Sequence, residues 1–472
     1  MKRCTKECAN TLESQRIVRA HRLKGVHGVK KLREETSGNS GSFQKNSRCN
    51  PLSIRFVLHI RNRTNSGPGG IFQLLRGPYG YDGGKYIYIH TAGHTRLKVE
   101  RSFHNMKLSF SKQDLLKGIN TVARAVPTHT TMPVLECILI DARTNQITFT
   151  ANDTELGIST VTDGTIVEKG TVAINARIFS DIAKKLPDDL ICIETDERNT
   201  MTITCGSVVF NIPGQSGEEF PYLPAIAKDK AVTLSQFLLK SLIEQTIFCT
   251  APNDNNKMMQ GELFEIRNGV LRIAALDGHR IALRTVKLDG TPDDEKVIVP
   301  GKTLQEVARI LGNDTDSKVE LFFTKNHLMF AFDSTLVVTQ LIEGEYFRIQ
   351  QMINCDYETK VTVSKNDFAG AIDRSTTMIR ETEHKPIALK IGEDEMEVSA
   401  NTELGRMNDR IPATVEGEEL MIGFNPKFLL DALKVVPDEM VTMYFSGSKR
   451  PLFIRDEESS YLYLILPVNM GV

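Results

Sequence analysis

A pattern that recurs every 125 residues constrains this chain more than any other feature of its sequence. Three segments read as a strand followed by a helix: TVAINARIFSDIAKKLP, KVIVPGKTLQEVARILG and LMIGFNPKFLLDALKVVP. In each helix the apolar residues follow the i, i+3, i+4, i+7 spacing of one face, beginning at Phe179, Leu304 and Leu429. Equal spacing and equal pattern together indicate three copies of one structural unit.

Each copy also begins with a strand that leads into a second helix, in MKLSFSKQDLLKGINTV, AVTLSQFLLKSLIEQ and KVTVSKNDFAGAIDRS. Ser111, Ser235 and Ser364 stand where these helices start and are suitable N-caps. Alternating stretches such as QITFTAND and EMEVSAN predict strands between the helices, and paired strands follow the second helix. We therefore expect an α+β fold of three repeats, each with two helices packed on a mostly antiparallel sheet.

The predicted boundaries place the repeats at 106–228, 229–355 and 356–472 and leave 1–105 as an extension. The extension carries 20 basic and 6 acidic side chains, whereas the remainder carries 38 and 53. Its basic and Gly/Ser-rich segments show little periodicity, which is typical of a disordered or nucleic-acid-attracting tail. A second interpretation is that Met106 is the true start and that the preceding residues are a non-native leader.

The cysteine pattern and the apolar runs exclude several classes of protein. The eight cysteines include no CxxC pair and are too sparse for a disulfide scaffold, so reduced thiols are expected. Cys4 and Cys8 with His21 and His27 match no standard zinc-finger spacing. The longest apolar runs fall well short of the roughly 20 residues of a membrane span. We expect a cytoplasmic protein without a metal or cofactor.

Basic residues also follow the 125-residue offset on the second helix of each repeat. Arg177, Lys302 and Lys427 form one set, and Lys184, Arg309 and Lys434 form the other. At about 100° per residue, both sets point away from the apolar face. A solvated surface with i, i+4 ion pairs to Asp181, Glu306 and Asp431 is the plainer interpretation. Three basic helix faces on an acidic body instead predict contact with a phosphate backbone, independent of base sequence.

The stretch ALDGHRIAL gathers three polar residues between apolar flanks and suggests an active site. In an enzyme, His279 would be the base, Asp277 its orienting group and Arg280 an anion clamp. Alternation along a strand would put Asp277 and His279 on one side and Gly278 and Arg280 on the other. The sequence contains no Gly-rich phosphate loop, metal-ligand cluster or nucleophile elbow to accompany them. We therefore predict a non-catalytic protein.

From Met106 to Val472 the chain resembles the bacterial DNA polymerase III beta subunit family, the beta sliding clamps. The segments that carry the resemblance are PVLECILI, ALDGHRIAL, IGFNPKFLLDAL and YLILPV. It implies that two chains close head to tail into a six-domain ring around double-stranded DNA, with helices lining the hole. It also implies that the ring tethers the replicative polymerase for processive synthesis. The implied partners are DNA, a second copy of the chain, the polymerase, the clamp loader and other clamp-motif proteins, without a membrane.

The resemblance further implies a cleft between the second and third repeats that accepts a short motif with a Gln and a Leu/Phe tail. In it, Gly278 would permit close backbone approach, His279 and Arg280 would frame the groove, and Asp277 would fix the local turn. Phe347, Gln351 and Asn469 depart from the family, which usually has Pro, Arg and Arg there. The implied cleft residues are Met259, Leu276, Gly278, His279, Arg280, Ile281, Phe347, Met352, Asn425, Phe428, Pro451, Leu464, Ile465, Leu466, Pro467, Val468 and Met470.

The resemblance also implies DNA-facing and ring-closing residues. His129 and a second loop with Asn253, Lys257 and Met258 would join the basic helix residues at the DNA. Phe210 and Ile212 would form one edge of the dimer interface, and Thr377 and Met378 the other. The alternative to a clamp is a DNA-binding protein that acts through the basic extension, with or without sequence specificity.

Overall fold

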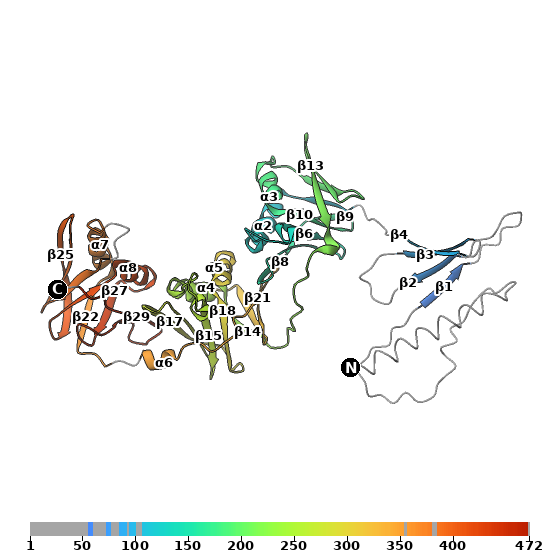
Figure 1. Ribbon diagram of the computed structural model, residues 1–472. Coiled ribbons are helices and arrows are strands. Elements are labelled where there is room, and N and C mark those ends of the chain that lie inside the picture. The colour runs from blue at the N-terminus through green and yellow to red at the C-terminus, as the bar shows by residue number, and fades with distance from the viewer. Residues whose placement is uncertain are drawn as a thin grey trace, which may run out of the picture. The chain divides into compact units, whose positions relative to one another are not determined.

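The computed structural model describes residues 106–353, 356–379 and 385–470, together with the backbone of four strands in the extension (Figure 1). The chain divides into two compact units, Met1–His104 and Asn105–Val472. Within the described residues, no helix is long and apolar enough to cross a membrane.

The first unit contains an antiparallel sheet in the order β1-β2-β3-β4. Its strands are β1 (Arg55–His59), β2 (Phe72–Arg76), β3 (Lys85–Thr91) and β4 (His94–Glu100). All four strands lie within the basic extension. A stretch such as KYIYIHT alternates aromatic and β-branched residues, which suits a strand despite the basic composition around it.

The second unit contains the three predicted helix pairs. They are α2 (Lys112–Val122) with α3 (Ala176–Lys185), α4 (Gln236–Glu244) with α5 (Gly301–Ile310), and α7 (Lys365–Thr376) with α8 (Pro426–Val435). A short helix, α6 (Ile349–Met352), lies in the connection between the second and third repeats. Ser111, Ser235 and Ser364 each accept a backbone N–H of the first turn, which confirms the predicted N-caps.

The strands of each repeat flank these helices. The first repeat contains β5 (Lys107–Phe110), β6 (Cys137–Asp141), β7 (Ile147–Asn152), β8 (Leu156–Thr162), β9 (Thr165–Glu168), β10 (Thr171–Asn175), β11 (Ile191–Thr195), β12 (Thr200–Cys205) and β13 (Val208–Ser216). The second contains β14 (Val232–Ser235), β15 (Gly261–Arg267), β16 (Val270–Leu276), β17 (Arg280–Lys287), β18 (Glu295–Pro300), β19 (Lys318–Phe323), β20 (His327–Phe332) and β21 (Thr335–Gln340). The third contains β22 (Thr359–Ser364), β23 (Ile387–Ile391), β24 (Glu395–Thr402), β25 (Gly405–Gly417), β26 (Leu420–Phe424), β27 (Met440–Phe445), β28 (Leu452–Arg455) and β29 (Tyr461–Ile465).

These strands form two large sheets, and both sheets continue from one repeat into the next (Figure 1). The 13-stranded sheet joins the first and second repeats where β8 pairs with β21. The 12-stranded sheet joins the second and third repeats where β17 pairs with β29. All pairs among the described strands of these sheets are antiparallel, so the predicted sheet type is confirmed.

The helices cover one face of the sheets, which we call the helix face, and the opposite face is the outer face. Phe179, Leu304 and Leu429 are fully buried in the cores beneath the helices, as their spacing predicts. Alternation separates the two faces along β29. Tyr463 belongs to the helix-face core, whereas Leu464 belongs to a third apolar cluster on the outer face.

Candidate functional site: the junction between the second and third repeats

A tight turn separates β16 from β17 and places the polar residues of ALDGHRIAL. Asp277 Oδ1 accepts the backbone N–H groups of His279, at 3.0 Å, and Arg280, at 3.1 Å. Gly278 has φ +84°, a left-handed conformation that favours glycine. A Cβ at Gly278 would meet only the end of the Met259 side chain, at 4.0 Å. Glycine is therefore favoured here by its left-handed φ and not by the close approach of another part of the chain. The prediction that Asp277 fixes the turn is confirmed.

Arg280 is buried, only 7% exposed, and ties the two repeats together. Its Nε donates to Asp277 Oδ2 at 2.9 Å and its Nη1 to Asp431 Oδ2, on α8, at 2.9 Å. Its Nη2 donates to the carbonyl of Phe248 at 2.7 Å. The guanidinium also lies over the rings of Phe428, at 4.4 Å, and Phe248, at 5.3 Å. Each of the three guanidinium nitrogens donates a hydrogen bond within the protein, so Arg280 stabilises the junction.

The electrostatics of Arg280 follow from this enclosure. Burial lowers its pKa, but the Cys249 thiol and the carboxylates of Asp431 and Asp277 outweigh that effect, and the net shift is upward. The strand alternation expected for this stretch is wrong at Asp277, because 277–279 form a turn between strands. Asp277 and Arg280 consequently contact one another, and Asp277 is not an orienting partner for His279.

His279 is exposed and its ring stacks on Phe428, with centroids 6.0 Å apart and planes 26° apart. Its carbonyl accepts the backbone N–H of Leu466 at 2.9 Å. The residue therefore links the turn of the second repeat to the chain that follows β29. Among the described residues its ring has no hydrogen bond to a carboxylate, and only its backbone N–H donates to Asp277.

The implied cleft residues fall into three classes of burial, which we call floor, wall and rim. The floor residues are the five buried ones: Leu276, Arg280, Ile281, Leu464 and Ile465. The wall residues are half-buried: Met259, Phe347, Asn425, Phe428, Pro451 and Pro467. The rim residues are exposed: Gly278, His279, Met352, Leu466, Val468 and Met470.

Much of the floor and wall belongs to one outer-face apolar cluster that spans both repeats. Leu276, Ile281 and Leu464 are members of this cluster, and Met259 and Phe347 pack against it. The exposed rim adds large apolar side chains, since Met352 is 45% and Leu466 38% exposed. Flexible Met and aliphatic groups around a buried apolar floor suit an adaptable surface for short peptides.

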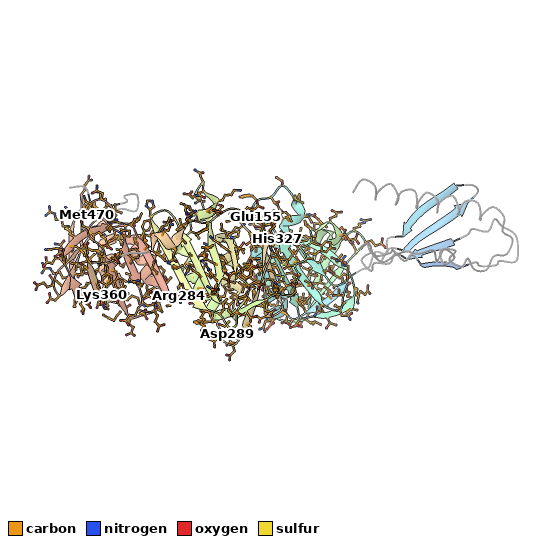
Figure 2. The ribbon with its side chains drawn as sticks, turned by 90° about the horizontal axis from the view of Figure 1, so that it is seen from below. Glu155, Arg284, Asp289, His327, Lys360 and Met470 are labelled. Atoms are coloured by element: carbon orange, nitrogen blue, oxygen red, sulfur yellow. The ribbon has the colours of Figure 1, made fainter. Side chains whose placement is uncertain are left out.

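The chain after β29 forms one side of the rim. The backbone N–H of Val468 donates to the carbonyl of Gly423, on the edge strand β26, at 2.8 Å. A Cβ at Gly423 would lie 2.5 Å from Met470 Cγ, so the glycine makes room for that side chain. Met470 is 38% exposed at the surface of the third repeat (Figure 2).

The six predicted basic residues are all exposed on the second helices, opposite the buried helix positions. Their ion pairs differ from the expected i, i+4 set. Lys302 Nζ contacts Asp153 Oδ2, in the first repeat, at 2.8 Å. Arg309 contacts Glu306 at 2.5 Å, and Lys434 contacts Asp431 at 3.8 Å. In each of these pairs the basic side chain is exposed, whereas its carboxylate partner is 7% to 17% exposed.

The loop residues implied at the DNA divide into two groups. His129, Asn253 and Lys257 are exposed. Met258 is half-buried and packs against the outer-face cluster that also holds Leu276. Part of its apolar side chain is thus used in this cluster.

The residues implied in ring closure lie at two ends of the second unit. Phe210 and Ile212 lie on β13, where Phe210 is half-buried and Ile212 is 9% exposed within its own core. Thr377 and Met378 follow α7, and Thr377 is exposed. Val209, which precedes Phe210 on β13, is 56% exposed and was not identified from the sequence.

Ile178 and Phe248 were not identified from the sequence, although the 125-residue offset relates Ile178 to the implied cleft residue Phe428. Ile178, Thr303 and Phe428 occupy equivalent positions 125 residues apart. Thr303 is 2% exposed and bonds to Thr339, and Phe428 packs at the 2–3 junction, whereas Ile178 is 46% exposed. Phe248, which contacts Arg280, carries no comparable sequence signal.

No group of three or more His, Cys, Asp or Glu side chains in the described part of the chain is placed to hold a metal ion. The sketched set of Cys4, Cys8, His21 and His27 lies outside the described residues.

The three repeats match the domains of a known protein family. The family model of the DNA polymerase III beta subunit matches in three consecutive parts. Its N-terminal domain matches residues 106–224, its central domain 233–347 and its C-terminal domain 350–469.

Individual relatives agree with the family model. A beta sliding clamp of Bacillus subtilis is 34% identical over 378 residues, covering 77% of this chain and 100% of the relative. A crystal structure of the Bacillus subtilis DNA polymerase sliding clamp superposes with a TM-score of 0.75 at 32% identity, over 78% of this chain and 100% of that one. A crystallised Eubacterium rectale protein of the DNA polymerase III beta type gives a TM-score of 0.75 at 50% identity, with the same coverage. The chain therefore belongs to the bacterial DNA polymerase III beta subunit family, the beta sliding clamps.

Proposed function

We propose that two copies of this chain close into a ring that slides along duplex DNA and tethers the replicative polymerase. The observation that carries the proposal is the repeated junction. The same kind of strand pairing joins the first repeat to the second and the second to the third, and it leaves one complementary edge at each end of the unit.

The two internal junctions show which strands pair where one repeat meets the next. At the first, β8 pairs with β21 from Leu156↔Thr339 to Thr160↔Thr335. At the second, β17 pairs with β29 from Arg280↔Ile465 to Arg284↔Tyr461. Arg284 Nη1 donates to Ser460 Oγ at 3.2 Å at this second junction (Figure 2). In both, the second strand of a hairpin pairs with the last strand of the next repeat.

The corresponding strands of the third pairing are β25 and β13. Over Gly405–Pro412, β25 pairs with β24 and with no other described strand. Over Val208–Pro213, β13 pairs with β12 and with no other described strand. An unpaired strand edge is a template for another chain. We infer that β25 of one chain pairs with β13 of a second, which closes a head-to-tail dimer through two such contacts.

Exposed apolar residues support these edges as an interface. Val209 on β13 and Ile178 on α3 are 56% and 46% exposed. Of the equivalents of Ile178, Thr303 is buried and Phe428 is half-buried against Arg280 of the neighbouring repeat. Phe210, half-buried on β13, would add to the buried area.

The helix face supports contact with DNA. The body from 106 onward is acidic overall, yet each second helix presents two exposed basic residues. Positive charge confined to one face attracts a phosphate backbone without reading bases. The chain then has no reaction of its own to perform: it is a processivity subunit that acts in the cytoplasm, where bacterial chromosomes are copied.

The outer-face cleft supports the tethering role. Its buried apolar floor and exposed Met352 and Leu466 suit a short linear motif with a Gln and a Leu/Phe tail. The replicative polymerase, the clamp loader and other clamp-motif proteins would compete for it.

Primer extension on a long circular template tests the proposal. The chain should lengthen the products of a DNA polymerase III made in a single binding event. Met259→Ala with Leu466→Ala should abolish that gain while the thermal unfolding midpoint stays within a few degrees, because both side chains are partly exposed. Met440→Ala is the matched control, since Met440 is 51% exposed outside the cleft. A cleft variant that retains full processivity would contradict the tethering role.

A further inference from the structure

A pocket of about 420 Å³, lined mainly by polar and charged residue types, lies on the outer face of the second repeat, apart from the residues assigned to the cleft. The tip of the β15–β16 hairpin and one residue of α6 form it. Its lining residues are Glu265, Arg267, Asn268, Val270, Arg272 and Gln350.

The hairpin holds the pocket in a defined shape. Asn268 and Gly269 have φ +52° and +74°, as a two-residue turn with both central residues left-handed requires. The N–H of Asn268 donates to Asp294 Oδ1 at 3.0 Å. Glu265 and Arg272 are direct cross-strand neighbours, and Arg272 Nη1 contacts Glu265 Oε2 at 3.1 Å. The arginine is therefore fixed by one of its nitrogens.

The pocket has more donors than acceptors. Arg272 Nε is covered and has no hydrogen-bond partner. Arg267 is exposed, and the ion pairs of the described residues do not include it. Glu265 neutralises one of the two arginines, so the lining keeps one net positive charge, and Gln350 adds an amide. A guanidinium with free donors is the group best suited to a planar oxyanion.

The pocket and the candidate cleft share two structural elements, β16 and α6. Arg272 and Leu276 both lie on β16 and face the outer side, since their positions differ by an even number. Four residues of strand correspond to about 13 Å. Gln350 and Met352 lie together on α6. A residue that flanks an extended peptide in the cleft can therefore reach the pocket, whereas DNA on the helix face cannot.

We propose that this pocket binds a carboxylate of the peptide docked in the cleft, so that an acidic residue flanking the motif strengthens docking. The proposal rests on the proposed docking function of the cleft. A free phosphate carries the same oxyanion chemistry and is the other possible source.

Fluorescence anisotropy with the full chain tests this inference. Labelled peptides carry a Gln and Leu/Phe motif, with three Asp residues on either the N-terminal or the C-terminal side, and matched peptides carry Asn instead. One Asp-flanked peptide should bind about fivefold more tightly than its Asn counterpart at low salt, and the difference should shrink in 0.5 M salt.

Three variants locate the effect. Arg267→Gln, and Arg272→Gln combined with Glu265→Gln, should remove the preference for Asp and leave binding of the Asn peptide unchanged. Lys325→Gln removes an exposed charge from the same repeat and should preserve it. Equal binding of both peptides by the unaltered chain, or a preference that survives Arg267→Gln, would overturn the proposal.

Failure of docking is distinguishable from failure of the pocket. If neither peptide binds, the proposed cleft function fails, and with it the peptide as the source of the carboxylate. A titration with inorganic phosphate, followed through the arginine side-chain NMR signals, then decides the pocket by itself. Shifts of Arg267 and Arg272 would identify free phosphate as the ligand, and unchanged signals would show that the pocket binds no oxyanion.

Discussion

Replacing Arg280 by Ala should lower the stability of the fold more than it lowers the affinity for a docked peptide. The side chain of Arg280 is 8% exposed, and those of Asp277 and Asp431 are 14% and 17% exposed. Solvent therefore screens these pairs little. Removal of one partner of a buried ion pair costs about 3–5 kcal/mol, because the remaining charge stays buried without its counter-ion.

The loss should fall mainly on the second and third repeats, which Arg280 joins. We expect urea unfolding, followed by circular dichroism, to show a free energy of unfolding about 3–5 kcal/mol lower for the transition of these repeats. Asp431→Asn should cost less, about 1–3 kcal/mol, since Arg280 keeps Asp277 and the Phe248 carbonyl. Arg177→Ala, at an exposed helix position, should change stability by no more than about 0.5 kcal/mol.

Peptide affinity separates this account from a direct role in docking. If Arg280 framed the groove as the sequence suggests, Arg280→Ala would lower peptide affinity and leave unfolding unchanged. That result would refute the reasoning from burial. A destabilised protein that still binds peptide at low temperature would support it.

Three further predictions concern other parts of the molecule. Met352→Ala with Leu466→Ala should weaken peptide binding about tenfold in an anisotropy titration without altering urea unfolding, because both side chains are exposed; a lower unfolding midpoint would contradict this. Burial raises the pKa of Glu262 well above its usual 4.5, and Thr246, whose hydroxyl donates to the Leu242 carbonyl at 2.9 Å, opposes this only weakly. The folded state therefore holds this proton more tightly, so its contribution to stability is complete below the unfolded pKa and is lost as pH rises. Glu262→Gln should accordingly be more stable than the unaltered chain by about 1 kcal/mol or more at neutral pH, with an advantage that shrinks towards pH 5 in urea unfolding; a constant advantage would refute the assignment. Val209→Asp should convert a dimer to a monomer in light scattering without loss of helical signal, and a persistent dimer would place the interface elsewhere.

The features that sequence predicts well here are local ones. The apolar faces that begin at Phe179, Leu304 and Leu429 depend on helix periodicity alone, and all three residues are buried. The N-caps depend on a residue and the turn that follows it. Because the same apolar spacing occurs in three segments, each segment independently supports the helix prediction.

The features that sequence did not reveal depend on residues far apart in the chain. Arg280 is buried because Asp431 lies 151 residues further on, and no local pattern contains that contact. Lys302 pairs with Asp153, 149 residues earlier, where the helix spacing suggests Glu306. Alternation failed at Asp277 because a turn interrupts the two strands there. The depth of each cleft residue likewise depends on how two repeats meet.

Retention on DNA tests the central claim, a closed ring that holds duplex DNA topologically. The chain is loaded by a bacterial clamp loader onto nicked circular DNA, and bound protein is measured by gel filtration before and after a single cut. We expect the chain to remain on circles, with or without residues 1–105, and to leave after the cut. Equal retention on circular and linear DNA, or retention that disappears when residues 1–105 are removed, would contradict the ring and favour binding through the basic extension.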